Sequence, residues 1–200
     1  DIKSSLPYML GLLMSAQNGI RNQEKTRVRE EVEKITAGFG ENRPNMLHNL
    51  IQSLDTNEVE WYLKLVSNEG IYEYFAELLI AAQPDYLTEE KVYVEEEEIS
   101  VELREILNFK SFDDIDKYNR KAAKYLFVRI LSSQFVDKLF FQVFKSEFPT
   151  ISKFLESLKN IGEASDKHKC SSQILQRIES YIVLELIAKE FVRRYDAPIY

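Results

Sequence analysis

The chain has 200 residues, of which 44% are hydrophobic and 30% are charged. This balance is typical of a folded domain and excludes a wholly disordered chain. The single cysteine, Cys170, excludes a disulfide scaffold and indicates a reducing compartment such as the cytoplasm. No apolar stretch reaches about eighteen residues, so we expect no membrane partner. The opening residues have no signal-peptide character and no initiator methionine, so we expect a part of a longer protein.

The formal net charge of −7, taken alone, argues against a nucleic-acid-binding domain. The charges are nevertheless sorted along the chain. Residues 85–105 hold nine acidic and two basic side chains, whereas residues 117–145 hold seven basic side chains and one acidic side chain. The region 117–145 is therefore basic enough locally to favour an anionic partner.

The first half of the chain is expected to be largely helical, because glycines and prolines are few. Residues 2–17 should begin extended and become an apolar helix near Pro7. Residues 38–44 form the clearest loop. Asp55 is the expected N-cap of a helix that Gly70 ends. The spacing of apolar residues predicts helices over 23–36, 45–54, 56–69 and 71–82.

The second half contains the one convincing strand signal, at residues 91–94, which runs into four glutamates. Ser100 is the expected N-cap of a helix over 101–107. Asp113 and Asp114 should open a long basic helix. Further helices are predicted over 114–135, over 136–159 with a break near Pro149, and over 166–195, the last being the longest.

Four cations of the basic helix share one face, at spacings i, i+3, i+4 and i+7: Lys117, Arg120, Lys121 and Lys124. Like charges on one helix face repel each other, so the arrangement costs stability unless an anion offsets it. A triphosphate or a nucleic-acid backbone is such an anion. A solvent-exposed face beside the acidic segment 85–105 explains the same pattern.

A second polar stripe follows the same spacing on the helix over 166–195: Gln173, Gln176, Arg177 and Ser180. Amide side chains both donate and accept hydrogen bonds, which suits the edges of bases and sugars. A face that only meets water is the alternative. Asp1, ahead of an apolar helix, is a candidate ligand for a hard divalent cation. The chain has only two histidines, His48 and His168, so it offers few residues that could form a zinc site or a Ser-His triad.

In chain order, these features resemble the segment of family A DNA polymerases that lies between the first and second catalytic carboxylate motifs, especially in divergent phage and mobile-element members. Five stretches carry the resemblance and together span nearly the whole chain: 1–7 (DIKSSLP), 70–76 (GIYEYFA), 120–127 (RKAAKYLF), 144–159 with Phe148-Pro149 inside it, and 173–180 (QILQRIES). The closing residues 196–200 resemble the strand that enters the second carboxylate motif.

The resemblance implies a role for each matching residue. Asp1 would bind the catalytic metals, two Mg²⁺ ions whose second carboxylate ligand lies outside this chain. Arg120 and Lys124 would hold the triphosphate of the incoming deoxynucleotide, with Tyr125 and Phe127 as candidates to stack on its base. A further set would contact primer–template DNA: Gln173, Gln176, Arg177, Lys117 and Lys121.

Two positions depart from the family pattern. Leu6 stands where many members carry glutamate or glutamine, so the family's way of discriminating sugars does not carry over. Ser132-Ser133 replaces the Tyr-Gly that usually ends the fingers motif. The acidic region near 85–105 is expected to be an insertion.

The resemblance therefore implies a mainly α fold, a fingers-type helical bundle with a small partial palm of one or two strands. Residues 1–20 would start the palm, 21–165 would form the helical fingers, and 166–200 would return to the palm. The implied function is template-directed DNA synthesis together with the remainder of the polymerase, in a bacterial host cytoplasm if phage-encoded. A single-subunit phage-type RNA polymerase and a non-enzymatic helical interaction module are the alternatives.

Overall fold

The computed structural model describes residues 2–15, 49–68, 70–94, 99–109, 114–132, 138–160, 167–181, 188 and 192–194. Within these residues the chain is mainly helical with one small sheet, which confirms the mainly α class. The helix expected over 23–36, the loop over 38–44 and the strand over 196–200 lie outside the described residues. None of the described helices is long and apolar enough to cross a membrane.

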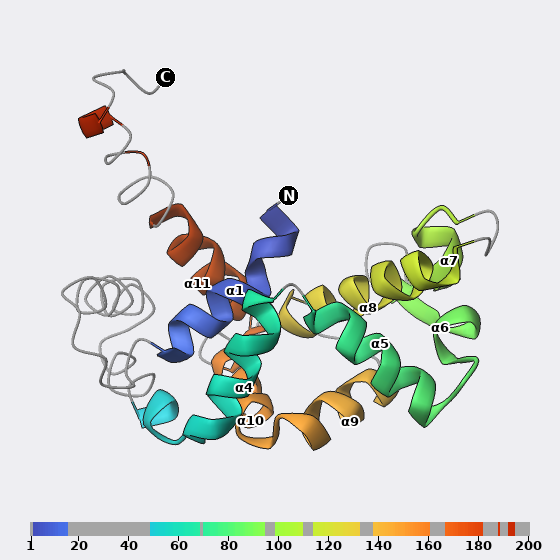
Figure 1. The fold of residues 1–200 in the computed structure, drawn as a ribbon, viewed down its shortest axis with the longest axis horizontal. Helices are drawn as coiled ribbons and strands as arrows, with labels where there is room; N and C mark the ends of the chain where they lie inside the picture. Colours follow the sequence, from blue (N-terminus) through green and yellow to red (C-terminus); the bar gives the residue numbers. More distant parts are fainter. Residues whose placement is uncertain are drawn as a thin grey trace.

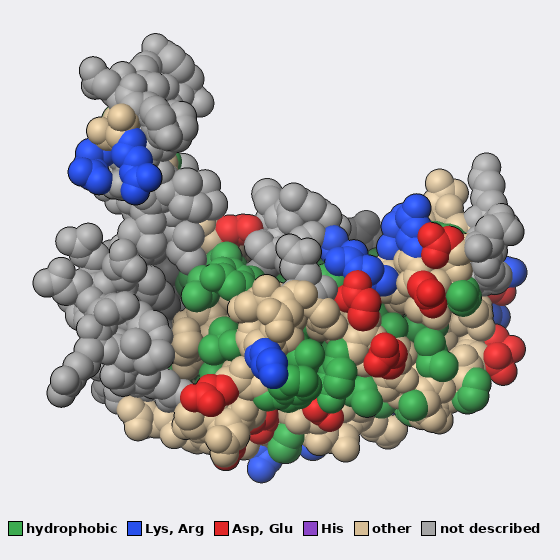
Figure 2. Space-filling model, in the orientation of Figure 1, with side chains coloured by type: hydrophobic (Ala, Val, Ile, Leu, Met, Phe, Trp, Pro, Cys, Tyr) green, Lys and Arg blue, Asp and Glu red, His purple; other side chains and the backbone are tan. Residues whose placement is uncertain are grey.

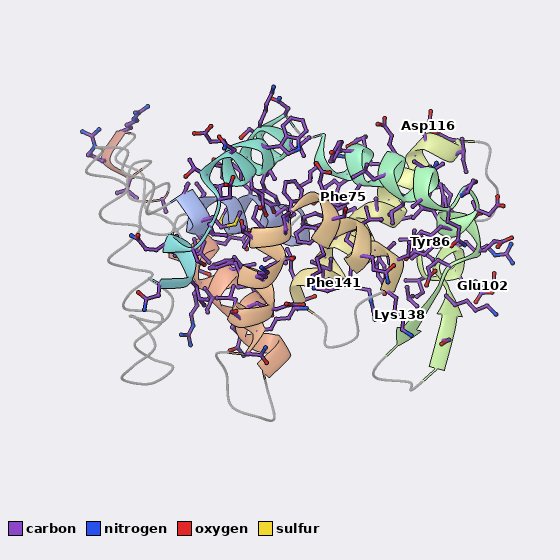
Figure 3. All side chains as sticks on the ribbon, turned by 90° about the horizontal axis from the view of Figure 1, so that it is seen from below. Phe75, Tyr86, Glu102, Asp116, Lys138 and Phe141 are labelled. Carbon is purple, nitrogen blue, oxygen red and sulfur yellow. The ribbon has the colours of Figure 1, made fainter. Side chains whose placement is uncertain are left out.

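The described elements are α1 (Ile2–Ser15), α4 (Thr56–Ser67), α5 (Ile71–Ala82), α6 (Tyr86–Glu89), β1 (Lys91–Val94), β2 (Ile99–Glu102), α7 (Leu103–Ile106), α8 (Ile115–Ser132), α9 (Lys138–Glu147), α10 (Pro149–Lys159) and α11 (Lys167–Tyr181). Figure 1 shows α5 and α8 side by side through the middle of the molecule, and these helices pack on each other. The α1 and α11 helices pack together at one end, and the β1–β2 hairpin lies at the other (Figures 1 and 3).

An aromatic cluster forms the core between α5, α8 and the α9–α10 pair. Phe75 lies inside it (Figure 3), with its ring centroid 5.4 Å from that of Phe127 and 5.6 Å from that of Phe144. Phe140 and Phe148 lie 5.5 and 5.9 Å from Phe75 and are also fully buried. Buried ring pairs stabilise a core beyond the area that they remove from water, so this cluster fixes α5 against α8.

The extended segment expected at the start of the chain is wrong, because α1 is helical from Ile2 and passes through Pro7. Tertiary packing accounts for the difference. The hydroxyl of Tyr62 on α4 donates a hydrogen bond to the Pro7 carbonyl at 2.9 Å. A Cβ at Gly11 would lie 2.8 Å from the Leu63 side chain, so glycine permits the close approach of α1 to α4. Burial of the apolar face thus outweighs the hydrogen bond that proline removes.

The cap predicted at Asp55 is confirmed, since its side chain accepts a hydrogen bond from the Glu58 backbone N–H at 2.9 Å. The role predicted for Gly70 is different in the structure. The α4 helix ends at Ser67 with Asn68 as its C-cap, and Gly70 is the N-cap of α5.

The strand predicted over 91–94 is confirmed as β1, but the helix predicted from Ser100 is wrong. Ser100 lies in β2, where it is paired with Tyr93 in an antiparallel ladder. Lys91 stands opposite Glu102 at the other end, a pairing of opposite charges that favours this register. Helix begins only at Leu103. Residues 99–102 form a strand because they pair with β1, and a capping signal in the local sequence does not show this pairing.

The basic helix begins at Ile115, where the Asp114 carboxylate accepts a hydrogen bond from the Lys117 backbone N–H at 3.1 Å. The break near Pro149 is confirmed, because α9 ends at Glu147 and α10 starts at the proline. The helix predicted over 166–195 is described as far as Tyr181. In the described residues α8, with 18 residues, is longer than α11, with 15.

Candidate anion-binding site

The antiparallel packing of α5 on α8 brings together two stretches that lie about fifty residues apart in sequence. The start of α8 lies beside α6, the helix that follows α5, where the Tyr118 hydroxyl donates to the Leu87 carbonyl at 2.7 Å. Further along α8, the Phe127 ring lies 6.1 Å from the ring of Tyr72 in the first turn of α5. The segment from Arg120 to Lys124 therefore lies beside the amino-terminal half of α5.

The Arg120 side chain is held from two sides. Its guanidinium carbon lies 5.6 Å from the centroid of the Tyr72 ring, a cation–π contact. Its Nε donates a hydrogen bond to Glu73 and forms an ion pair with that carboxylate. The two charged side chains remain 42% and 46% exposed, so the guanidinium is positioned and still accessible from solvent.

Lys124 lies one turn after Arg120 and is half-buried. Burial lowers the pKa of the Lys124 ammonium, and the positive charge of Arg120 lowers it further. Both effects disfavour the charged form of the lysine. A bound anion between the two side chains would offset them.

The amino terminus of α5 faces the same region without a side-chain cap. No side-chain hydrogen bond to the first-turn amides is made by its N-cap, Gly70. A Cβ at Gly70 would meet only the Asn68 carbonyl oxygen, at 4.0 Å, so the space around it is open. Helix N-termini with uncapped N–H groups favour negative charge.

Tyr72 is only 7% exposed, and its hydroxyl has no hydrogen-bond partner in the part of the chain that the structure describes. Burial raises the pKa of this hydroxyl, Arg120 lowers it in part, and Glu73 raises it. Buried hydroxyls without a partner are uncommon in folded proteins. The contacts of Tyr72 are therefore made by its ring, which packs between Arg120 and Phe127.

The predicted stripe of four cations separates into two pairs. Arg120 and Lys124 are partly buried, with Arg120 in contact with α5, whereas Lys117 and Lys121 are exposed. The Lys121 ammonium lies 4.9 Å from the centroid of the Phe109 ring. Figure 2 shows Lys and Arg side chains, with acidic ones beside them, along the upper margin of the molecule over α8.

Of the two predicted base-stacking candidates, only Tyr125 has exposed surface. It is half-buried, and the Arg129 guanidinium lies 5.8 Å from its ring centroid. Phe127 is fully buried in the aromatic core, where its ring also lies 6.5 Å from that of Tyr62. The Phe127 ring therefore has no exposed face in the structure.

The polar stripe of α11 is exposed, as its spacing predicts. Gln173, Gln176 and Arg177 face solvent, while the opposite side of the helix is buried through Ile174, Leu175 and Ile178. The α11 helix packs on α1, α8 and α10. Its place beside α8 is fixed by Ser171, whose hydroxyl donates to the Leu131 carbonyl at 2.6 Å.

The predicted metal ligand, Asp1, lies outside the described residues. The helix that follows it, α1, packs on both α8 and α11. Among the described side chains, no group of three or more His, Cys, Asp or Glu could hold a metal ion. Glu102 and Asp116, labelled in Figure 3, lie at the opposite end from α1.

Sequence reasoning did not select Gly70, Tyr72 or Glu73 as site residues, although they belong to a stretch that carries the resemblance. The signal that identifies them is the packing of α5 on α8, which no local pattern shows. No family model, curated protein or solved structure matches the chain.

Proposed function

We propose that the chain is the fingers-bearing part of a template-directed DNA polymerase, which transfers a nucleotidyl group from a deoxynucleoside triphosphate to a primer end. The observation that carries the proposal is the contact of Arg120, one turn before Lys124 on α8, with Tyr72 in the first turn of α5. Both stretches carry the resemblance to family A polymerases, and both contribute positive potential at one place.

The chemistry of phosphoryl transfer suits this arrangement. The reaction depends mainly on positioning and on neutralising charge that spreads over phosphate oxygens. Arg120 and Lys124, one turn apart, would bind neighbouring phosphates, and the first amides of α5 would add donors. Of the two predicted stacking residues, Tyr125 is the one whose side chain is partly exposed.

Two Mg²⁺ ions would, when bound, activate the primer hydroxyl and stabilise the leaving pyrophosphate. Asp1 is the residue of this chain that the resemblance assigns to them. The contribution that we propose for the described residues is anion binding through Arg120 and Lys124.

Primer–template DNA would be bound by the exposed cations and amides of two helices. Gln176 and Arg177, together with Gln173, would contact the minor groove, where every base pair offers acceptors. Lys117 and Lys121 would contact the phosphate backbone.

Calorimetric titration of the chain with a deoxynucleoside triphosphate tests the proposal. Lys124→Ala should weaken binding by about tenfold, because one charge-assisted contact is lost. The same variant should change the affinity for primer–template DNA by less than about threefold. Lys153→Ala, at an exposed lysine of α10, is the matched control and should change neither.

The two alternatives give different results. A single-subunit RNA polymerase would bind ribonucleotides at least as tightly as deoxynucleotides. A helical interaction module would show no affinity for primer–template DNA at low salt, where basic surfaces bind best. The proposal would be contradicted if Lys124→Ala weakened the binding of primer–template DNA more than the binding of the triphosphate.

A further inference from the structure

The candidate anion-binding site already contains a negative charge. The Glu73 carboxylate forms an ion pair with Arg120 from the first turn of α5. It thereby occupies the Nε edge of the guanidinium, one of the edges at which an arginine can bind phosphate. A carboxylate at this place also lowers the positive potential that Lys124 and the α5 amides provide.

The ion pair is weak enough to be displaced. Both side chains are more than two fifths exposed, and solvent-exposed pairs contribute little to stability. When Glu73 leaves, the guanidinium is still held by the Tyr72 ring, 5.6 Å from its centroid. Arg120 therefore keeps its position whether its partner is Glu73 or an external anion.

We infer that Glu73 is a resident carboxylate that occupies Arg120 until a polyphosphate displaces it. The inference rests on the anion-binding part of the proposed function. Side chains four residues apart on a helix are about 5–6 Å apart at their Cβ atoms, so a chain of linked phosphates can contact Arg120 and Lys124 together. An anion that engages only one of them must compete with Glu73 without the second contact, which makes di- and triphosphates the preferred class.

Titration with inorganic tripolyphosphate at low salt tests the inference. Glu73→Gln should raise the affinity by about three- to fivefold, because it removes the competing charge but keeps the size of the side chain. Glu77→Gln removes the same charge from an exposed position one turn further along α5 and should raise it by less than about 1.5-fold. Unchanged or weaker binding by Glu73→Gln would overturn the inference and show that Glu73 only positions Arg120.

A second pair of variants separates competition from a general effect of charge. In an Arg120→Ala background, Glu73→Gln should raise the affinity for tripolyphosphate by no more than Glu77→Gln does, because the ion pair no longer exists. A gain as large as in the wild-type background would overturn the inference. Melting temperatures should agree within about 2 °C between Glu73→Gln and wild type, as expected for an exposed pair.

The failure of this inference is distinguishable from that of the polymerase proposal. If tripolyphosphate binds and Lys124→Ala weakens it while Glu73→Gln does not strengthen it, only the role of Glu73 is overturned. If Glu73→Gln strengthens binding but a deoxynucleoside triphosphate binds no better than tripolyphosphate, the inference about Glu73 is supported and the polymerase proposal is not. If tripolyphosphate does not bind wild type or Glu73→Gln, both are overturned.

Discussion

The Glu58 carboxylate of α4 accepts a hydrogen bond from the backbone N–H of Ile151 at 2.7 Å, across 93 residues of sequence. The same carboxylate accepts from the Thr150 backbone N–H at 3.0 Å and from its hydroxyl at 2.8 Å. One helix thus caps the amino terminus of another, and the negative charge is placed where the dipole of α10 favours it.

Replacement of Glu58 by alanine should lower the free energy of unfolding by about 1–2 kcal/mol, the usual cost of losing a cap. Urea denaturation measures the change. Glu60→Ala, at an exposed position of the same helix, is the control and should stay within about 0.5 kcal/mol of wild type. Equal effects of the two variants would show that the cap contributes nothing.

Tyr72→Phe should leave the free energy of unfolding unchanged or raise it by up to about 1 kcal/mol, because the hydroxyl that it removes has no partner among the described residues. Tyr62→Phe, which removes the hydrogen bond to the Pro7 carbonyl, should lower it by about 1 kcal/mol. A loss for Tyr72→Phe as large as that for Tyr62→Phe would contradict the assignment of the unpartnered hydroxyl.

The stability of the protein should fall at alkaline pH through Tyr74. Burial, followed by its hydrogen bond to the Glu147 carboxylate, raises the pKa of Tyr74 from 10.0 to about 12. The fold thus favours the protonated phenol, so its contribution is complete below pH 10 and is lost as the pH rises towards 12. Denaturation of wild type and Tyr74→Phe between these limits should show a steeper decline for wild type. Parallel declines would contradict this origin.

Two residues of α11 should affect DNA binding in different ways. Arg177→Ala should reduce the slope of log affinity against log salt by about one, as expected for a lost phosphate contact. Gln176→Ala should weaken binding without changing the slope, because an amide releases no counterion. Filter binding to primer–template DNA across a salt series measures both. Identical slopes for wild type and Arg177→Ala would remove Arg177 from the interface.

Local signals predicted the helical character, the Asp55 cap, the strand over 91–94 and the break at Pro149. They failed where a distant partner decides the structure. Ser100 is a good N-cap by type, yet its segment pairs with Tyr93 in a ladder. The extended start predicted ahead of Pro7 is instead helix, because α1 packs on α4 and α11.

The candidate site shows the same limit. Helical spacing placed Arg120 and Lys124 on one face together with Lys117 and Lys121, but in the structure only the first two are partly buried. The sequence predicted Phe127 as a stacking residue, whereas in the structure its ring is fully buried in the core. Glu73 and Tyr72 contact Arg120 at the candidate site because α5 packs on α8.

The aromatic core has a mechanical consequence for any ligand-driven motion. Phe127 of α8 contacts Phe75 of α5 and Phe144 of α9, so these helices share one tightly filled interior that resists sliding. A hinge within this interior would break several ring contacts at once. Movement towards a substrate would therefore carry α5, α8 and α9 as a unit, with the spacing between Gly70 and Arg120 unchanged.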